Sequence, residues 1–275
     1  MARAVSVRIV PSRYDIRLRT TRRAALIGGA ALTLSIASGM KAADLKPGES
    51  GRVKTVPSGD VVNLDSGLRV RLAGIATPRR DDPFAREARE GLAGLVRGRE
   101  VRLSYGGDPR DRYGRALAQL HTLSPAGGND LWVQAEMVRL GLARVYSWPD
   151  EVLDVDTLYA LEAEARQLGR GLWSDATYRI RGPEPNALAQ HVDSLQIVEG
   201  IVTSTADVRG RAYLNFGADY RTDFTVAVAK KHRKRFTEFD PVDLEGARIR
   251  VRGWIELTNG PMIWASHPAR IEVLS

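Results

Sequence analysis

The stretch "RVRLAGIATPRRDDPF", residues 69–84, carries side chains suited to chemistry on a charged ligand. It alternates like a strand and then enters a loop in which Arg79 and Arg80 are followed at once by Asp81 and Asp82. Arginine donates a planar fork of hydrogen bonds that matches a phosphate, and carboxylates supply the hard oxygens that divalent cations prefer. Asp82 precedes Pro83 and an amphipathic run, which favours a helix cap over a metal ligand.

Two further polar positions lie where strands are expected to turn. Asp60 follows Gly59 after the first strand run, and taken alone it is most simply a turn residue. Asp111 and Arg115 flank Tyr113 in "DRYGR" between two strand runs, where an ion pair could tie down a hairpin. Apolar spacing predicts helices over 82–96, 130–142 and 154–168, the last ended by Gly169 and Gly171.

The order of these motifs resembles the staphylococcal nuclease (thermonuclease) family. The motifs are Gly-Asp, Arg-Leu-x-Gly-Ile-x-Thr-Pro, a helix with Glu-Ala, Asp-Arg-Tyr-Gly-Arg, Val-Arg-x-Gly-Leu-Ala and Gly-Leu-Trp-Ser, within residues 51–177. The resemblance implies a mainly β fold with helices, namely a five-stranded OB-type barrel with three helices. It also implies cleavage of phosphodiesters in DNA or RNA with one Ca²⁺.

The resemblance further implies a role for each matching residue. Arg71 and Arg115 match the two arginines that grip the scissile phosphate, and Arg112 and Tyr113 match residues that meet a terminal phosphate. Asp60 matches a metal-ligand carboxylate, and Thr77 matches a threonine whose backbone carbonyl binds calcium.

The loop departs from the family pattern at two positions. The family's Asp-[Thr/Ala]-Pro-Glu is written here Ala76-Thr77-Pro78-Arg79, so a metal carboxylate and the glutamate that orients the attacking water are absent. We therefore expect a weak or absent Ca²⁺ site, with the loss of general-base assistance worth about 10²- to 10⁴-fold in rate. Arg79 would instead add positive charge to the phosphate grip. An alternative is a rearranged metal site in which Asp81, Asp82 or Glu87 takes the vacated position.

A second β module is predicted beyond a polar linker at 178–196. Residues 197–275 contain several strand runs and resemble a small OB-type barrel that accompanies some secreted nucleases. OB barrels bind single strands through basic and aromatic residues on one sheet face. The predicted polymer-binding residues are Arg250, Arg252, Trp254 and Trp264, with Lys230, Lys231 and Arg233 from "KKHRKRF". Packing of the two barrels on each other through these aromatics, and a solvated basic stretch, are the alternatives.

Most of the positive charge lies in the first 43 residues. They hold eight Lys and Arg against one acid, which accounts for +7 of the net charge of +8. Thr21-Arg22-Arg23 before a short apolar run is typical of a twin-arginine export signal. We expect domains at 1–43 (signal), 50–177 and 197–275, and a periplasmic or secreted protein without stable membrane insertion after cleavage. The absence of cysteine excludes disulfides.

These observations predict an exported protein that binds nucleic acid or another polyanion, with phosphodiesterase activity lost or reduced. The first alternative is an active Ca²⁺-dependent nuclease with a rearranged metal site. The second is an envelope scaffold that binds a protein partner. No feature of the sequence separates DNA from RNA.

Overall fold

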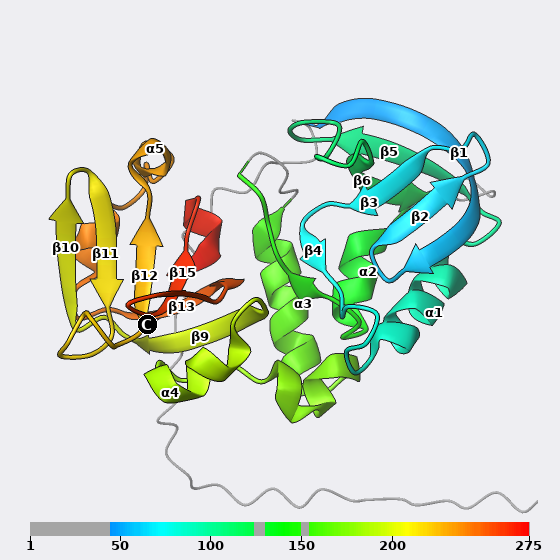
Figure 1. The fold of residues 1–275 in the computed structure, drawn as a ribbon. Helices are drawn as coiled ribbons and strands as arrows, with labels where there is room; N and C mark the ends of the chain where they lie inside the picture. The colour runs from blue at the N-terminus through cyan, green and yellow to red at the C-terminus, as the bar shows by residue number, and fades with distance from the viewer. Residues whose placement is uncertain (1–44, 124–129, 150–153, 275) are drawn as a thin grey trace, which may run out of the picture. The chain divides into compact units, whose positions relative to one another are not determined.

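A closed five-stranded barrel occupies the first part of the computed structural model, which describes residues 45–123, 130–149 and 154–274 (Figure 1). The predicted leader lies outside these residues. The barrel strands are β1 (Lys46–Ser58), β2 (Val61–Leu64), β3 (Arg69–Leu72), β5 (Glu100–Tyr105) and β6 (Ala116–Thr122). They follow one another antiparallel in the order β3-β2-β1-β5-β6, and a parallel pairing of β3 with β6 closes the barrel. This confirms the predicted mainly β, OB-type architecture.

The turn between β1 and β2 depends on Gly59. A Cβ atom on Gly59 would lie 2.7 Å from the Ala88 Cβ and 3.0 Å from the Thr77 Cβ. Only glycine therefore lets the β1–β2 turn approach both the 76–80 loop and the first helix so closely. That approach brings Asp60 to the same end of the barrel as Thr77.

Three helices pack against the barrel: α1 (Ala85–Val96), α2 (Val133–Arg139) and α3 (Val155–Gln167). The first two begin later than predicted. The Asp82 carboxylate accepts a hydrogen bond from the Arg79 backbone N–H and so caps the loop, while Phe84 is the N-cap of α1. Leu131 and Trp132 form the short strand β7 against β6, so α2 starts at Val133. The third helix matches the predicted range closely: it starts after Asp154, whose side chain caps it.

The second part of the chain contains further sheets around its own hydrophobic core. One sheet has the order β10-β11-β12-β15-β14, from Ser204–Val208, Arg211–Asn215, Thr225–Val228, Gly260–Trp264 and Glu256–Thr258. The other has the order β16-β13-β9, from Ile271–Leu274, Arg248–Trp254 and Leu195–Ile201. Ile249, Val251 and Ile255 are buried in this core, whereas Leu257 on β14 is exposed.

The segment predicted as a linker is packed against the second module. It contains α4 (Pro185–Leu188), and Leu188 is fully buried in the second core. Arg181 forms a β-bridge with Val198 at the edge of β9. The polar composition of this segment does not reveal that Leu188 anchors it in the second core.

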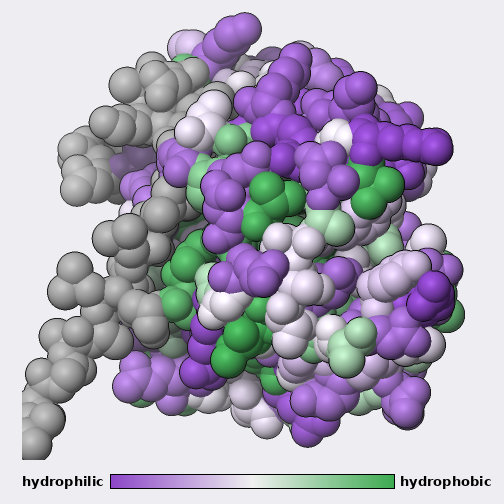
Figure 2. All heavy atoms as spheres, turned by 90° about the vertical axis from the view of Figure 1, so that its left-hand side faces the viewer, coloured by the Kyte–Doolittle hydropathy of each residue, from purple (hydrophilic) through white to green (hydrophobic). Residues whose placement is uncertain are grey.

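Short elements complete the chain. They are β4 (Ile75–Ala76), β8 (Arg144–Val145), α5 (Lys230–Arg233) and the 3-10 turns η2 (Gly171–Ser174), η3 (Ala176–Tyr178), η4 (Ala189–His191), η5 (Pro241–Leu244) and η6 (Pro268–Arg270). Within the described ranges, no helix has the length and apolar character needed to cross a membrane. The face seen in Figure 2 is largely hydrophilic, with hydrophobic residues in small separate patches.

The two β modules are joined by a buried ion-pair network, and all described residues fall in one compact unit. Arg252 of β13 is 1% exposed and donates to the Glu162 carboxylate of α3 at 2.9 Å and to Glu272 at 2.5 Å. It also donates to the Val145 carbonyl, and Glu162 accepts from the Val145 N–H. Burial alone would lower the pKa of Arg252, but the neighbouring carboxylates raise this pKa above its usual value. This arginine therefore stays charged and links the modules.

Candidate nucleic-acid interface

A pocket of about 1130 Å³ is lined largely by the first barrel and collects most of the site residues predicted in that barrel. We call it the arginine pocket, because eight arginines and three aspartates line it: Arg71, Arg79, Arg80, Arg86, Arg89, Arg110, Arg112, Arg115, Asp60, Asp108 and Asp111. The excess of positive charge in one concave surface favours a polyanionic ligand. Aromatic side chains complete the lining, from Tyr113, Tyr146, Trp148 and Trp254.

Asp60, in the turn before β2, forms an ion pair with Arg71 on β3. The Arg71 Nε lies 3.5 Å from the Asp60 Oδ2, and the Ser58 hydroxyl donates to the Asp60 Oδ1 at 2.8 Å. The Leu72 N–H donates to the Asp60 carbonyl, which fixes the turn against the strand. Asp60 is thus engaged on both carboxylate oxygens, while the Arg71 side chain lines the pocket and is 28% exposed.

The hairpin between β5 and β6 holds Arg115 and Tyr113 in place. The Asp111 carboxylate accepts from the Arg115 Nε at 2.7 Å and from the backbone N–H groups of Tyr113 and Arg115. Burial alone would raise the pKa of Asp111, but these hydrogen bonds keep this pKa below its usual value. The Tyr113 ring is 67% exposed, and Arg112 and Arg115 lie 4.8 and 5.2 Å from its centroid. The hairpin ion pair expected from sequence is therefore present, and it also presents an exposed aromatic ring at the pocket.

The 76–80 loop brings Arg79 into the pocket. Ala76 lies on β4, which pairs antiparallel with β8. The Arg79 backbone is held by Asp82, and its guanidinium lies 4.4 Å from the centroid of the Trp254 ring. Trp254 is the last residue of β13. The position where the family carries a glutamate thus holds a stacked guanidinium.

An aromatic wall that sequence reasoning missed follows β8. Tyr146 and Trp148 pack edge to face, and Arg270 lies 3.9 Å from the Tyr146 ring centroid. Arg270 also donates to the Ser147 carbonyl, and the Ser147 hydroxyl pairs with His267 at 2.7 Å. Burial and the charge of Arg270 lower the pKa of His267 to about 3, so the ring is neutral at physiological pH. The signal in the sequence was "YSWPD", where two aromatic residues precede a proline directly after β8.

Comparison with known proteins places this geometry in context. A family model described as staphylococcal nuclease homologue matches residues 69–175. An "Uncharacterized endonuclease" of Escherichia coli O157:H7 is 41% identical over 131 residues, covering 46% of this chain and 78% of that protein. A "Micrococcal nuclease" of Shigella flexneri is 36% identical over 155 residues, covering 55% of this chain and 87% of that protein. The chain belongs to the staphylococcal nuclease family.

The residues present do not fit the Ca²⁺ that the family resemblance implies. Within the described residues, no group of three or more His, Cys, Asp or Glu side chains could hold a metal ion. Asp60 is already engaged by Ser58 and Arg71, and Ala76 offers no side-chain oxygen. Asp81, Asp82 and Glu87 lie outside the pocket lining; Asp82 is bonded to the loop backbone, and Glu87 pairs with Arg86. In this conformation none of the three replaces the missing carboxylate.

The structure separates the predicted polymer-binding residues of the second module. Trp254 lines the arginine pocket, whereas Trp264 on β15 does not. The prediction for Arg252 is wrong, because this residue is buried between the modules. Two more of the predicted arginines are already paired with carboxylates. Arg250 pairs with Glu199 and Glu272, and Arg233 pairs with Asp207 and Asp240. Lys230 and Lys231 lie exposed on α5, outside the pocket lining.

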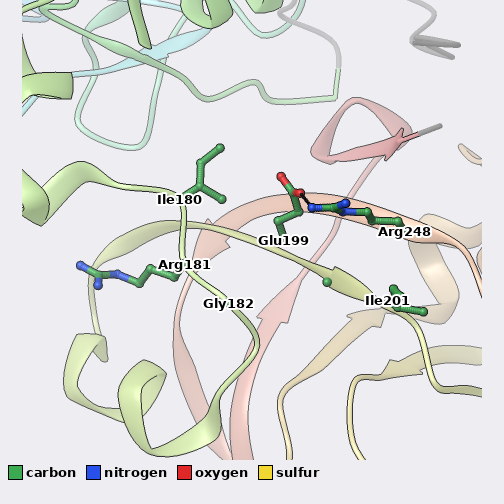
Figure 3. Close-up of a pocket in the computed structure, with 7 residues that line it drawn as sticks. Ile180, Arg181, Gly182, Glu199, Ile201 and Arg248 are labelled. Carbon is green, nitrogen blue, oxygen red and sulfur yellow. Dashed lines mark hydrogen bonds and ion pairs between the residues drawn. The ribbon is translucent and has the colours of Figure 1, made fainter. Parts of the chain in front are cut away.

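A second, smaller depression lies beside β9 and has a volume of about 440 Å³ (Figure 3). Its charged groups are already paired: Arg248 binds Glu199 at 2.6 Å. Figure 3 shows Arg181 pointing away from that pair, and its guanidinium donates to Gln196 and to the Thr177 carbonyl. The depression therefore presents little free charge to a ligand, and the arginine pocket is the better candidate site.

Proposed function

We propose that this protein binds nucleic acid or another phosphate-bearing polymer in the arginine pocket and does not hydrolyse it efficiently. Membership of the staphylococcal nuclease family supports a function on nucleic acid. The observation that carries the proposal is the composition of the pocket. Arg71 and Arg115 are retained, while Ala76 and Arg79 stand where the family has carboxylates.

The binding mechanism follows from the geometry of the two retained arginines. Each is anchored on one side by a carboxylate, Arg71 by Asp60 and Arg115 by Asp111. Anchoring reduces the side-chain entropy lost on binding, and each guanidinium keeps donors for a phosphate oxygen. Tyr113 beside Arg115 supplies a ring surface for the adjoining part of the ligand. The pocket therefore recognises phosphate together with a neighbouring planar group.

Hydrolysis is disfavoured by the same residues. A guanidinium at Arg79 has donors only and cannot accept a proton from an attacking water. Residue 76 is an alanine and carries no carboxylate. The Asp60 carboxylate is already engaged by Ser58 and Arg71. The chain thus retains the means to bind a phosphodiester but lacks the groups that activate water.

The proposal is tested by measuring binding and cleavage side by side. Full-length protein is titrated into fluorescein-labelled single-stranded DNA and RNA, and cleavage is followed on gels with Ca²⁺ and with chelator. We expect salt-sensitive binding without cleavage, and an Ala76→Asp/Arg79→Glu variant that gains Ca²⁺-dependent cleavage. Absence of binding at low salt, or cleavage by the natural chain that chelator abolishes, would contradict the proposal.

A second candidate function is Ca²⁺-dependent phosphodiester hydrolysis through a rearranged loop. It is favoured by the relatives, which include an endonuclease and a micrococcal nuclease. In that case Asp60 would bind the metal with Asp81, Asp82 or Glu87. Replacing Asp60 by Ala should then abolish a chelator-sensitive activity of the natural chain, whereas a catalytically inert binder has no such activity to lose.

We further propose that the protein is exported, which rests on the twin-arginine pattern at Arg22 and Arg23. Cell fractionation of a C-terminally tagged chain tests this directly. Export should stop when both arginines are replaced by lysine.

A role as an envelope scaffold would instead be indicated by a protein partner whose binding is insensitive to salt, because phosphate recognition weakens steeply as salt rises.

A further inference from the structure

One side chain from the second module enters the arginine pocket of the nuclease-like barrel. Trp254 ends β13 and is half-buried, and it lines the same pocket as Arg71 and Arg115. Its ring is covered by the Arg79 guanidinium, 4.4 Å from the ring centroid. The pocket is therefore completed by a residue more than a hundred positions beyond the barrel's phosphate grip.

The stack gives Arg79 a defined orientation. Its side chain is otherwise exposed, while its backbone N–H is held by Asp82 at 2.8 Å. A guanidinium held over an indole ring by a cation–π contact can still offer N–H donors to a phosphate. Unpaired bases stack on such guanidinium planes and on aromatic rings.

The module junction keeps Trp254 at this position. Arg252, two residues earlier on β13, is locked between Glu162 and Glu272, and it donates to the Val145 carbonyl. Trp254 therefore does not depend on a loop conformation of its own. The junction presets the tryptophan against the 76–80 loop before any ligand arrives.

We propose that Trp254 and Arg79 form a platform on which an unpaired nucleobase stacks, while its phosphate is held by Arg71 and Arg115. The ligand is then single-stranded nucleic acid, because the bases of a duplex have no free face to stack. A pocket of about 1130 Å³ has room for more than one nucleotide. This inference rests on the proposed function, since it assigns the ligand class of the same pocket.

The experiment compares tryptophan variants on single and double strands. Fluorescence anisotropy of full-length protein is measured with labelled ten-nucleotide oligothymidylate and with a ten-base-pair duplex. Because base–aromatic stacking is worth roughly 1–3 kcal/mol per base, Trp254→Leu should weaken single-strand binding about tenfold. Trp254→Phe should stay within about threefold of the natural chain, since the ring is retained. Trp264→Leu, in the same module but outside the pocket, is the matched control and should leave affinity unchanged.

A second variant keeps the test independent of folding at the junction. Arg79→Lys keeps the charge on an exposed side chain but loses the planar group, so it should weaken single-strand binding several-fold without changing the salt dependence. Equal affinities for the Trp254 and Trp264 leucine variants, an Arg79→Lys variant that binds like the natural chain, or equally tight duplex binding would each overturn the inference.

The double variant Arg71→Ala/Arg115→Ala distinguishes this inference from the proposed function. If this variant loses binding and the Trp254 variants do not, only the stacking platform is refuted. If this variant binds as tightly as the natural chain, the phosphate grip itself is refuted.

Discussion

Replacing Arg252 by methionine should strongly destabilise the folded protein. The guanidinium is 1% exposed and contacts two carboxylates, and Glu162 is equally buried. Removing the arginine leaves the Glu162 carboxylate with the Val145 N–H and with Arg166 at 3.8 Å. Breaking a buried pair by removing one partner costs about 3–5 kcal/mol. We expect a loss of that size in the free energy of unfolding.

Urea unfolding followed by circular dichroism and tryptophan fluorescence measures this loss. Arg248→Met is the matched control, because Arg248 lies on the same strand and pairs with Glu199 but is 62% exposed. An exposed pair of this kind contributes below about 1 kcal/mol. Adding Glu162→Gln to Arg252→Met should recover part of the loss, since the buried negative charge is removed. Equal destabilisation by Arg252→Met and Arg248→Met would refute the reasoning that the junction rests on a buried charge network.

Three further predictions concern the junction and the pocket. His267 is held neutral with a pKa of about 3 against 6.5 when unfolded, so its contribution to stability is present above pH 6.5 and is lost as the pH falls towards 3. Relative to His267→Gln, the natural chain should lose about 2 kcal/mol of unfolding free energy between pH 6.5 and 4.5, measured by urea unfolding, and parallel pH curves would contradict this. Gly59→Ala places a methyl group 2.7 Å from the Ala88 Cβ and should cost about 1–3 kcal/mol, measured by urea unfolding, whereas no change would mean that the turn can shift freely. Arg71→Ala should weaken binding of single-stranded DNA and lower the slope of log affinity against log salt by about 0.7, and an unchanged slope would place Arg71 outside the phosphate contact.

Much of the first barrel could be predicted from local patterns. The turn at Gly59 and the strand that opens the 69–84 stretch are encoded by residues close in sequence, and the observed strands β1, β2 and β3 agree with them. The order of motifs then indicated which loops meet at one end. The predicted start of the second helix was less accurate. Leu131 and Trp132 form β7 because they pair with β6, and local spacing does not reveal that partner strand.

The second module shows the limit of pattern reading most clearly. The sequence indicated Arg250, Arg252 and Trp254 of this strand as polymer-binding residues, but it could not say what covers each of them. Glu162, from a helix ninety residues earlier, converts Arg252 from a surface cation into a buried structural one. Trp254, two residues further on, instead reaches the pocket of the other module.

The sequence by itself determined the family, the β class, the retained arginines at 71 and 115 and the missing carboxylates at 76 and 79, because each depends on residue identity and order. Only the tertiary structure decided which charges are free to bind. Arg252 and Arg250 form ion pairs with carboxylates distant in sequence, while Arg79 lies over an indole ring supplied by the other module. The physical reason is that a side chain's charge is a local property, whereas its desolvation and pairing are set by whatever the fold packs beside it.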